Sequence, residues 1–135
     1  MREVVAVWKG GYQCTVRARH FDVPTDEPSS VGGDDTGPMP TEVFLASLAS
    51  CFCMAVYHVA RKRDIELSSL EVSVSGEYEG PRFRRLRVDV RPGDEIDDLQ
   101  QLLERAFAVC YVSNTLRNPP RLEIAVDDEV LVSHG

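Results

Sequence analysis

Hydrophobic and polar residues alternate along the N-terminal part of the chain, as in strands that bury one face. The alternation runs from Val4 to Trp8, stops at the turn signal Lys9-Gly10-Gly11, and resumes from Gln13 to Asp22. These two runs predict a hairpin, with a further short strand over His20 to Val23.

A long apolar helix is predicted in the middle of the chain. It begins at Pro40 or Thr41, where proline and a capping threonine suit a helix start, Glu42 suits the positive end of the helix dipole, and it runs to about Lys62. From Val43 to Ala60 the helix is apolar on every side, so we expect it to be buried all round, with a sheet on one face and another element on the other. The apolar run is shorter than the roughly 20 residues that cross a bilayer, and serines interrupt it, so we expect no membrane span.

The remaining elements follow the same two periodicities. We expect strands over Leu67–Tyr78 and Phe83–Val90, an amphipathic helix over Asp94–Val109, a last strand over Leu122–Val126 and a tail from Asp127 onward. The order of strands, helix, strands, helix and strand predicts an α+β fold. At 135 residues, we expect one domain over residues 1–135.

The segment between the third predicted strand and the long helix has a different composition. Residues 24–39 are rich in proline, glycine, serine and aspartate and offer little to bury. A loop of this length in a compact domain is usually functional or mobile.

The net charge of −7 argues against nucleic acid as a partner, because phosphates require a basic surface. Four cysteines without a visible secretion signal indicate a reducing compartment, so we expect a cytoplasmic protein. Cys51 and Cys53 form a C-x-C pair, but no further cysteine or histidine lies at the spacing of a zinc site. We therefore expect neither a metal nor a cofactor.

Two cysteines stand in distinctive settings. Cys51 lies inside the apolar helix, and Cys110 lies where the second helix breaks. If the fold brings them together, they form a redox-active dithiol; the alternative is that each is a small buried packing residue. Because the C-terminal end of a helix raises the pKa of a thiol, Cys110 suits a resolving role better than an attacking one.

Periodicity does not decide whether Cys51 or Cys53 faces a site. Residues two apart on a helix point about 200° apart, and Glu42 falls on the Cys53 side. His58 lies on the Cys51 side but about 10 Å along the helix, so we expect a buried, satisfied histidine. Cys14, on a strand among apolar residues, is predicted to be structural.

A run of arginines lies along the fifth predicted strand of this acidic chain. We expect it to form a solvated or dimer-facing sheet surface, with anion binding as the alternative. Its members are Arg82, Arg84, Arg85, Arg87 and Arg91.

The segments 32–51 and 106–113, which contain Cys51 and Cys110, resemble the OsmC/Ohr family of osmotically inducible and organic-hydroperoxide-resistance proteins. The order of elements fits as well. The resemblance implies an intertwined homodimer, with two antiparallel sheets wrapped around long central helices that pack back to back. Active sites would then lie at the subunit interface, and the partner would cover the second face of the apolar helix.

The resemblance also implies a thiol-dependent peroxidase. Cys51, selected over Cys53 by its position in the family motif, would attack the hydroperoxide and become a sulfenic acid. Cys110 would then close a disulfide, and a small dithiol or lipoyl-type reductant would reopen it.

Two positions depart from the hydroperoxide reductases of that family. Where they carry an arginine after the glycines of the first hairpin, this chain has Tyr12, and Arg17 or Arg19 is the candidate substitute. Where they carry a glutamate directly after the helix-opening proline, this chain has Thr41, with Glu42 one residue later. We take Glu42 as the third catalytic residue.

Two alternatives remain open. The first is a non-enzymatic dimer that binds a small apolar ligand at its interface, with the cysteines serving as packing residues. The second is another thiol reaction, such as disulfide exchange or electrophile scavenging, for which the Cys51–Cys53 pair leaves room.

Overall fold

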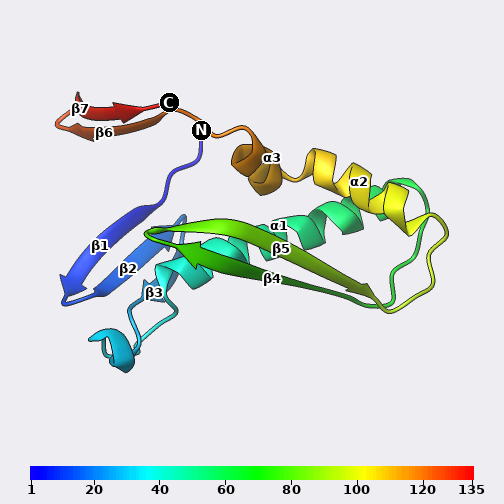
Figure 1. Ribbon diagram of the computed structural model, residues 1–135, viewed down its shortest axis with the longest axis horizontal. Coiled ribbons are helices and arrows are strands. Elements are labelled where there is room, and N and C mark those ends of the chain that lie inside the picture. Colours follow the sequence, from blue (N-terminus) through cyan, green and yellow to red (C-terminus); the bar gives the residue numbers. More distant parts are fainter. The chain divides into compact units, whose positions relative to one another are not determined.

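The N-terminal alternation forms the antiparallel sheet that it predicts. The computed structural model describes residues 1–135 and divides into two units, of which the first covers residues 1–46. This unit contains β1 (Val5–Gly10), β2 (Gln13–Ala18) and β3 (Phe21–Thr25), with β2 in the centre (Figure 1). The hairpin and the further strand are thereby confirmed.

The loop after β3 is ordered around a buried carboxylate. Asp26 is only 1% exposed, and it accepts hydrogen bonds from the amides of Glu27, Asp34 and Thr36 at 2.7, 3.3 and 3.1 Å. The Thr36 hydroxyl adds a fourth at 2.8 Å. Burial would raise the pKa of Asp26, but these hydrogen bonds outweigh it and lower the pKa below its usual value. A short 3-10 helix, η1 (Ser29–Val31), completes the segment.

The second unit covers residues 47–135 and holds the main core. Helix α1 (Pro40–Lys62) begins in the first unit and continues into this one. The antiparallel hairpin β4 (Leu70–Glu79) and β5 (Arg82–Pro92) follows, then α2 (Leu99–Val109) and α3 (Tyr111–Arg117). The chain ends in the hairpin of β6 (Leu122–Val126) and β7 (Glu129–His134).

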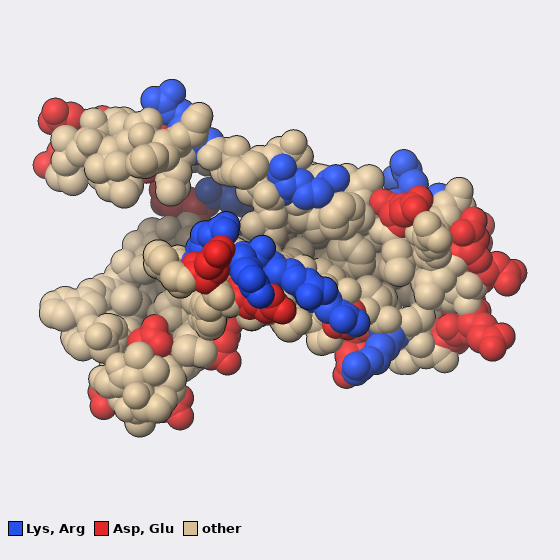
Figure 2. Space-filling view, in the orientation of Figure 1, with Lys and Arg blue, Asp and Glu red and all other residues tan.

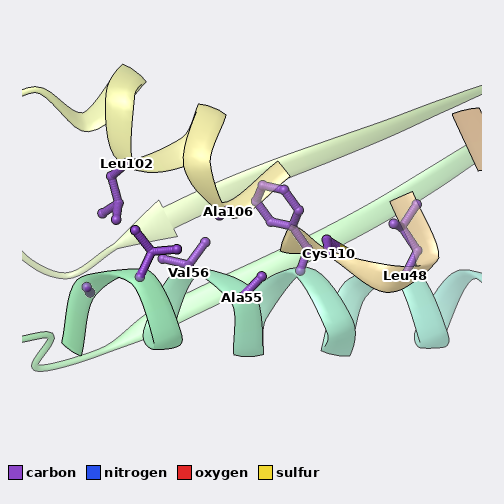
Figure 3. Close-up of a cluster of buried hydrophobic side chains, with 9 residues drawn as sticks. Leu48, Ala55, Val56, Leu102, Ala106 and Cys110 are labelled. Atoms are coloured by element: carbon purple, nitrogen blue, oxygen red, sulfur yellow. The ribbon is translucent and has the colours of Figure 1, made fainter. Parts of the chain in front are cut away.

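One side of α1 packs against α2 and the β4–β5 hairpin. Leu102 projects from α2 toward Val56 of α1, and Cys110 lies between α1 and the junction of α2 with α3 (Figure 3). Val72, Val88 and their apolar neighbours on β4 and β5 pack against the same cluster. The buried residues are Leu48, Phe52, Ala55, Val56, Val59, Ala60, Leu102, Ala106 and Cys110.

The expectation that α1 is buried all round is wrong for a single chain. Met54 is 70% exposed and Tyr57 is 56% exposed, both on the side that faces away from the core cluster. By length and composition alone the helix could cross a membrane, but one side of it packs against the core of its own chain. The apolar composition therefore leaves one stripe of this helix without cover in one chain.

The C-terminal segment is a hairpin rather than a strand and a tail. Asp127 and Asp128 adopt positive φ angles of 48° and 66°, which places both central residues of a two-residue turn in the left-handed region. Aspartate tolerates this region better than most residues, so the pair connects two strands where we expected the fold to end.

The second predicted helix begins later than its apolar pattern suggests. Asp98 occupies the N-cap, and its carboxylate accepts a hydrogen bond from the Gln101 amide at 3.3 Å, so α2 begins at Leu99 rather than near Asp94. Ile96 still packs against the core from the preceding loop. The α+β class predicted from the order of elements is confirmed.

Candidate functional site

The structure brings Cys51 and Cys110 together. Cys51 lies on α1 at the edge of its buried side, half-buried, and packs against the core cluster. Cys110 is 0% exposed and lies between α2 and α3. The Cys51 thiol is close enough to Cys110 to help lower its pKa, and both are free thiols. The pair singled out from the sequence therefore forms a dithiol in contact.

The expectation for the pKa of Cys110 is wrong. Burial does raise it, but hydrogen bonds from Ser113, both side chain and amide, from the Cys51 thiol and from the Val112 amide outweigh burial and lower the pKa below its usual value. The reason is that Cys110 does not only follow α2. It is also the N-cap residue of α3, so the Val112 and Ser113 amides at the start of that helix help to lower its pKa.

Ser113 is a site residue that the sequence reasoning missed. It is 4% exposed, and its hydroxyl is one of the groups that lower the pKa of Cys110. Ser113 stands three residues after the N-cap, the position from which a side chain reaches back to the capping residue in a capping box. That spacing was visible in the sequence, but it has meaning only once α3 is known to begin at Tyr111.

Cys51 also lines a groove on the surface of the second unit. The groove has a volume of about 640 Å³ and is lined by Cys51, Met54, Ala55, His58, Val109, Tyr111 and Asn114. Cys51 is therefore accessible to a small molecule, whereas Cys110 is not. His58 is exposed in this groove, which corrects the expectation of a buried histidine.

Glu42 has a defined place at the start of α1. Its carboxylate accepts a hydrogen bond from the Met39 amide at 2.9 Å, while the Met39 carbonyl accepts from the Val43 amide at 3.0 Å. This is one half of a capping box: Glu42, the third helical residue, reaches back to the Met39 amide, while the methionine side chain offers no hydrogen bond in return. Its position fixes the beginning of the helix that carries Cys51.

The two arginines considered as substitutes lie in the first unit. Arg17 on β2 donates from Nε to Asp22 at 3.0 Å, and this hydrogen bond, helped by the charge of Asp22, raises the pKa of Arg17. Arg19 lies in the turn between β2 and β3, with its guanidinium 5.1 Å from the centre of the Phe21 ring. Arg17 is thus already committed to a neighbouring carboxylate.

The other two cysteines are also free thiols. Cys14 is half-buried on β2, opposite Trp8 of β1 and Thr25 of β3. Cys53 is half-buried on α1 but belongs neither to the core cluster nor to the groove of Cys51.

The basic run forms a charge ladder on the outer face of the β4–β5 hairpin, seen as a blue band with red groups beside it (Figure 2). Because every guanidinium has a carboxylate partner, this surface offers little free positive charge to an anion. The ion pairs are Arg82–Glu79, Arg84–Glu77, Arg85–Glu77, Arg87–Asp89 and Arg91–Glu71.

The chain is similar to known proteins in sequence and in fold. A family model described as OsmC-like protein matches residues 32–125. An uncharacterized protein of Acinetobacter baylyi is 29% identical over 117 residues, which cover 82% of this chain and 78% of that one.

Two solved structures illustrate the shared fold. A protein from Psychrobacter arcticus, described as a putative osmotic stress induced and detoxification response protein, superposes with a TM-score of 0.75 at 21% identity, covering 85% of this chain and 88% of that chain. The organic hydroperoxide resistance protein OhrB of Bacillus subtilis superposes with a TM-score of 0.64 at 26% identity, covering 88% and 92%.

Proposed function

Because the chain belongs to the OsmC-like protein family, we propose that it is a thiol-dependent peroxidase that reduces organic hydroperoxides in defence against oxidative stress. The observation that carries this proposal is the proximity of the Cys51 and Cys110 thiols: Cys51 packs against the cluster that contains Cys110 and helps to lower the pKa of Cys110. Relatives named for organic hydroperoxide resistance, such as the Bacillus subtilis protein, support the same theme.

Cys51 is the attacking thiol in this proposal, because it lines the groove and Cys110 has no exposed surface. The Cys51 thiolate attacks the terminal oxygen of the hydroperoxide and the O–O bond breaks. The sulfur becomes a sulfenic acid, and the alkoxide takes a proton and leaves as an alcohol.

Cys110 then resolves the sulfenic acid. Its thiolate attacks the Cys51 sulfur, an S–S bond forms, and the hydroxyl group leaves as water after taking a proton. The lowered pKa of Cys110 favours the thiolate that this step requires, and the contact between the two side chains keeps the necessary movement small.

A small dithiol or lipoyl-type reductant completes the cycle. It donates two electrons, becomes a disulfide itself, and returns Cys51 and Cys110 to thiols. Glu42 remains the third residue of the proposed site, as the acid at the start of the helix that carries Cys51. Such chemistry suits the cytoplasm, where disulfides are reopened by reductants.

We propose further that the working form is a homodimer. The β6–β7 hairpin exposes apolar side chains along both strands, and an isolated two-stranded hairpin is marginally stable in water. The uncovered stripe of α1, with Met54 and Tyr57, is a second apolar surface that a partner would cover.

The test is mass spectrometry of the purified protein after one equivalent of cumene hydroperoxide, with free thiols blocked before digestion. A Cys51–Cys110 disulfide is expected within seconds. Cys51→Ser should abolish peroxide consumption, Cys110→Ser should allow one turnover without recycling, and Cys53→Ser serves as the matched control with full activity. Undiminished peroxide consumption by Cys51→Ser would refute the proposal.

A second candidate function rests on a different groove. The side of α2 that faces β5 leaves an apolar groove of about 610 Å³, lined in part by Leu86, Val88, Leu103 and Phe107. This groove favours a non-enzymatic protein that binds a small apolar ligand, with the ligand held within one chain rather than at the dimer interface that the sequence-based alternative expects. That alternative predicts that both thiols stay reduced in mild peroxide and resist alkylation until the protein unfolds.

A further inference from the structure

The loop between β3 and α1 is closed by contacts between its two ends. The Asp26 amide donates to the Pro38 carbonyl at 3.1 Å. One residue earlier, a Cβ on Gly37 would lie 2.5 Å from the Pro24 carbonyl oxygen, so only glycine allows the two flanks to approach this closely. Residues 26–38 therefore form a compact loop with adjacent ends, a class of loop that often has a function.

The carboxylate of Asp26 holds the interior of this loop. Its Oδ2 accepts hydrogen bonds from the Thr36 hydroxyl at 2.8 Å, the Thr36 amide at 3.1 Å and the Asp34 amide at 3.3 Å. Its Oδ1 accepts from the Glu27 amide at 2.7 Å. Asp26 is 1% exposed, so these donors replace the water that a charged group would otherwise need. One side chain thus fixes the path of the chain from Asp34 to Thr36.

The segment that Asp26 fixes leads directly to Glu42. Pro38 accepts from the Asp26 amide, and the next residue, Met39, donates its amide to the Glu42 carboxylate at 2.9 Å. Glu42 is exposed, and an exposed glutamate without a partner would spread over several rotamers. The Met39 amide selects one of them, and that amide lies where the closed loop places it.

We propose that Asp26 is the positioning residue of Glu42: by closing residues 26–38 it places the Met39 amide that holds the Glu42 carboxylate. Resting on the proposed function, in which Glu42 is the third residue of the site, this makes Asp26 act on the reaction of Cys51 only through Glu42. Asp26 itself is enclosed by the loop, with all four of its carboxylate hydrogen bonds made to loop residues.

The first experiment measures this arrangement without any reaction. Amide hydrogen exchange is followed by NMR at pH 7, at times too short for the buried Val56 of α1 to exchange, so that global unfolding does not contribute. In Asp26→Asn the Met39 amide should exchange about tenfold faster, as expected when a hydrogen bond to a charged group is lost. Glu42→Gln should accelerate exchange of the same amide, because it removes the charge of the acceptor.

Variants in the same loop supply the controls. Asp35→Asn makes the same change of charge at an exposed position with a φ of 55°, which asparagine tolerates, and should leave the exchange of Met39 unchanged. Thr36→Val removes the hydroxyl that donates to Asp26 and should accelerate Met39 even if Asp26→Asn does not fold, whereas Thr36→Ser should keep the parental rate. A parental rate for Met39 in Thr36→Val and in Asp26→Asn, or an acceleration only together with Val56, overturns the inference.

The second experiment asks whether Asp26 acts through Glu42. The rate at which one equivalent of cumene hydroperoxide oxidises Cys51 is measured in Asp26→Asn, in Glu42→Gln and in the double variant. Each single substitution should slow oxidation by a similar factor. The double variant should react no more slowly than Glu42→Gln, because Asp26 then has no carboxylate left to position. Factors that multiply in the double variant overturn the inference, because Asp26 would then act by another route.

The inference and the proposed function fail in different ways. If Cys51 never reacts with hydroperoxide in the parent protein, the peroxidase is refuted, while the exchange of Met39 still decides whether Asp26 positions Glu42. If Cys51 reacts rapidly in the parent protein and Met39 exchanges at the parental rate in Asp26→Asn, the positioning role is refuted and the peroxidase remains.

Discussion

Ser113→Ala tests whether the hydroxyl beside Cys110 prepares it for the resolving step. The substitution removes the side-chain hydrogen bond to the sulfur but leaves the amides of Val112 and Ser113 in place. A hydrogen bond to a charged group contributes about 1.5 to 3 kcal/mol, and the lower figure already corresponds to roughly a tenfold change in an equilibrium. The pKa of Cys110 should therefore rise, and less thiolate should be present at neutral pH.

The assay follows a single turnover in the stopped flow. One equivalent of cumene hydroperoxide oxidises Cys51, and closure of the disulfide is timed by quenching with dimedone, which labels only the sulfenic acid. At pH 7 we expect closure to slow by about tenfold in Ser113→Ala, because the thiolate is the attacking form. The two proteins should converge at alkaline pH, where Cys110 is ionised in both.

Two controls separate this effect from a general loss of structure. Ser113→Thr keeps a hydroxyl at the same position and should restore most of the rate, whereas Ser133→Ala on the exposed strand β7 should leave it unchanged. If Ser113→Ala slows closure equally at every pH, the hydroxyl acts only on structure and our reasoning about the thiolate is refuted.

Three further predictions concern the fold that holds the site. Leu102→Ala should lower the free energy of unfolding by about 2.7 to 5 kcal/mol in a urea titration, because Leu102 is 0% exposed and packs in the core cluster with α1. A loss below about 1 kcal/mol would mean that α2 moves to fill the cavity left by the side chain. Asp26→Asn should destabilise the protein at pH 7, and the difference should shrink below about pH 4. The pKa of Asp26 is lower in the folded than in the unfolded protein, so its carboxylate stabilises the fold at a pH above the unfolded pKa, and this stabilisation is lost as acid protonates it. Melting curves that differ equally at about pH 3 and pH 7 would contradict this. Gly37→Ala should cost about 1 to 3 kcal/mol by chemical denaturation, because its Cβ would lie 2.5 Å from the Pro24 carbonyl oxygen; unchanged stability would show that the loop moves freely.

Strong periodicity made most of the helices and strands predictable. The elements that were missed, β7 and α3, begin after residues that do not usually mark the start of a strand or helix. The alternation of β4 and β5 and the continuous apolar run of α1 each pointed to one kind of element. By contrast, β7 follows a pair of aspartates in left-handed conformation, and α3 follows a cysteine where serine or aspartate usually stands. Neither boundary carries the residues from which a start is normally read.

The candidate site shows the same division. That Cys51 and Cys110 are a pair was expected from the family motif, and the structure places them in contact. The direction of the pKa shift of Cys110 was predicted wrongly, because the sequence indicated the end of α2 but not the beginning of α3. A residue between two helices experiences both termini, and only the three-dimensional path shows which amides face its side chain.

The orientation of α1 is the feature that the sequence could least determine. A helix that is apolar all round has no hydrophobic direction, so the pattern does not say which side meets the core of its own chain. The structure turns Phe52 and Val56 inward, which places Cys51 at the edge of the buried side and leaves Met54 and Tyr57 outside. If a second copy covers that outer stripe, as we propose, the apolar sequence serves two interfaces at once, and the thiol stands where both meet.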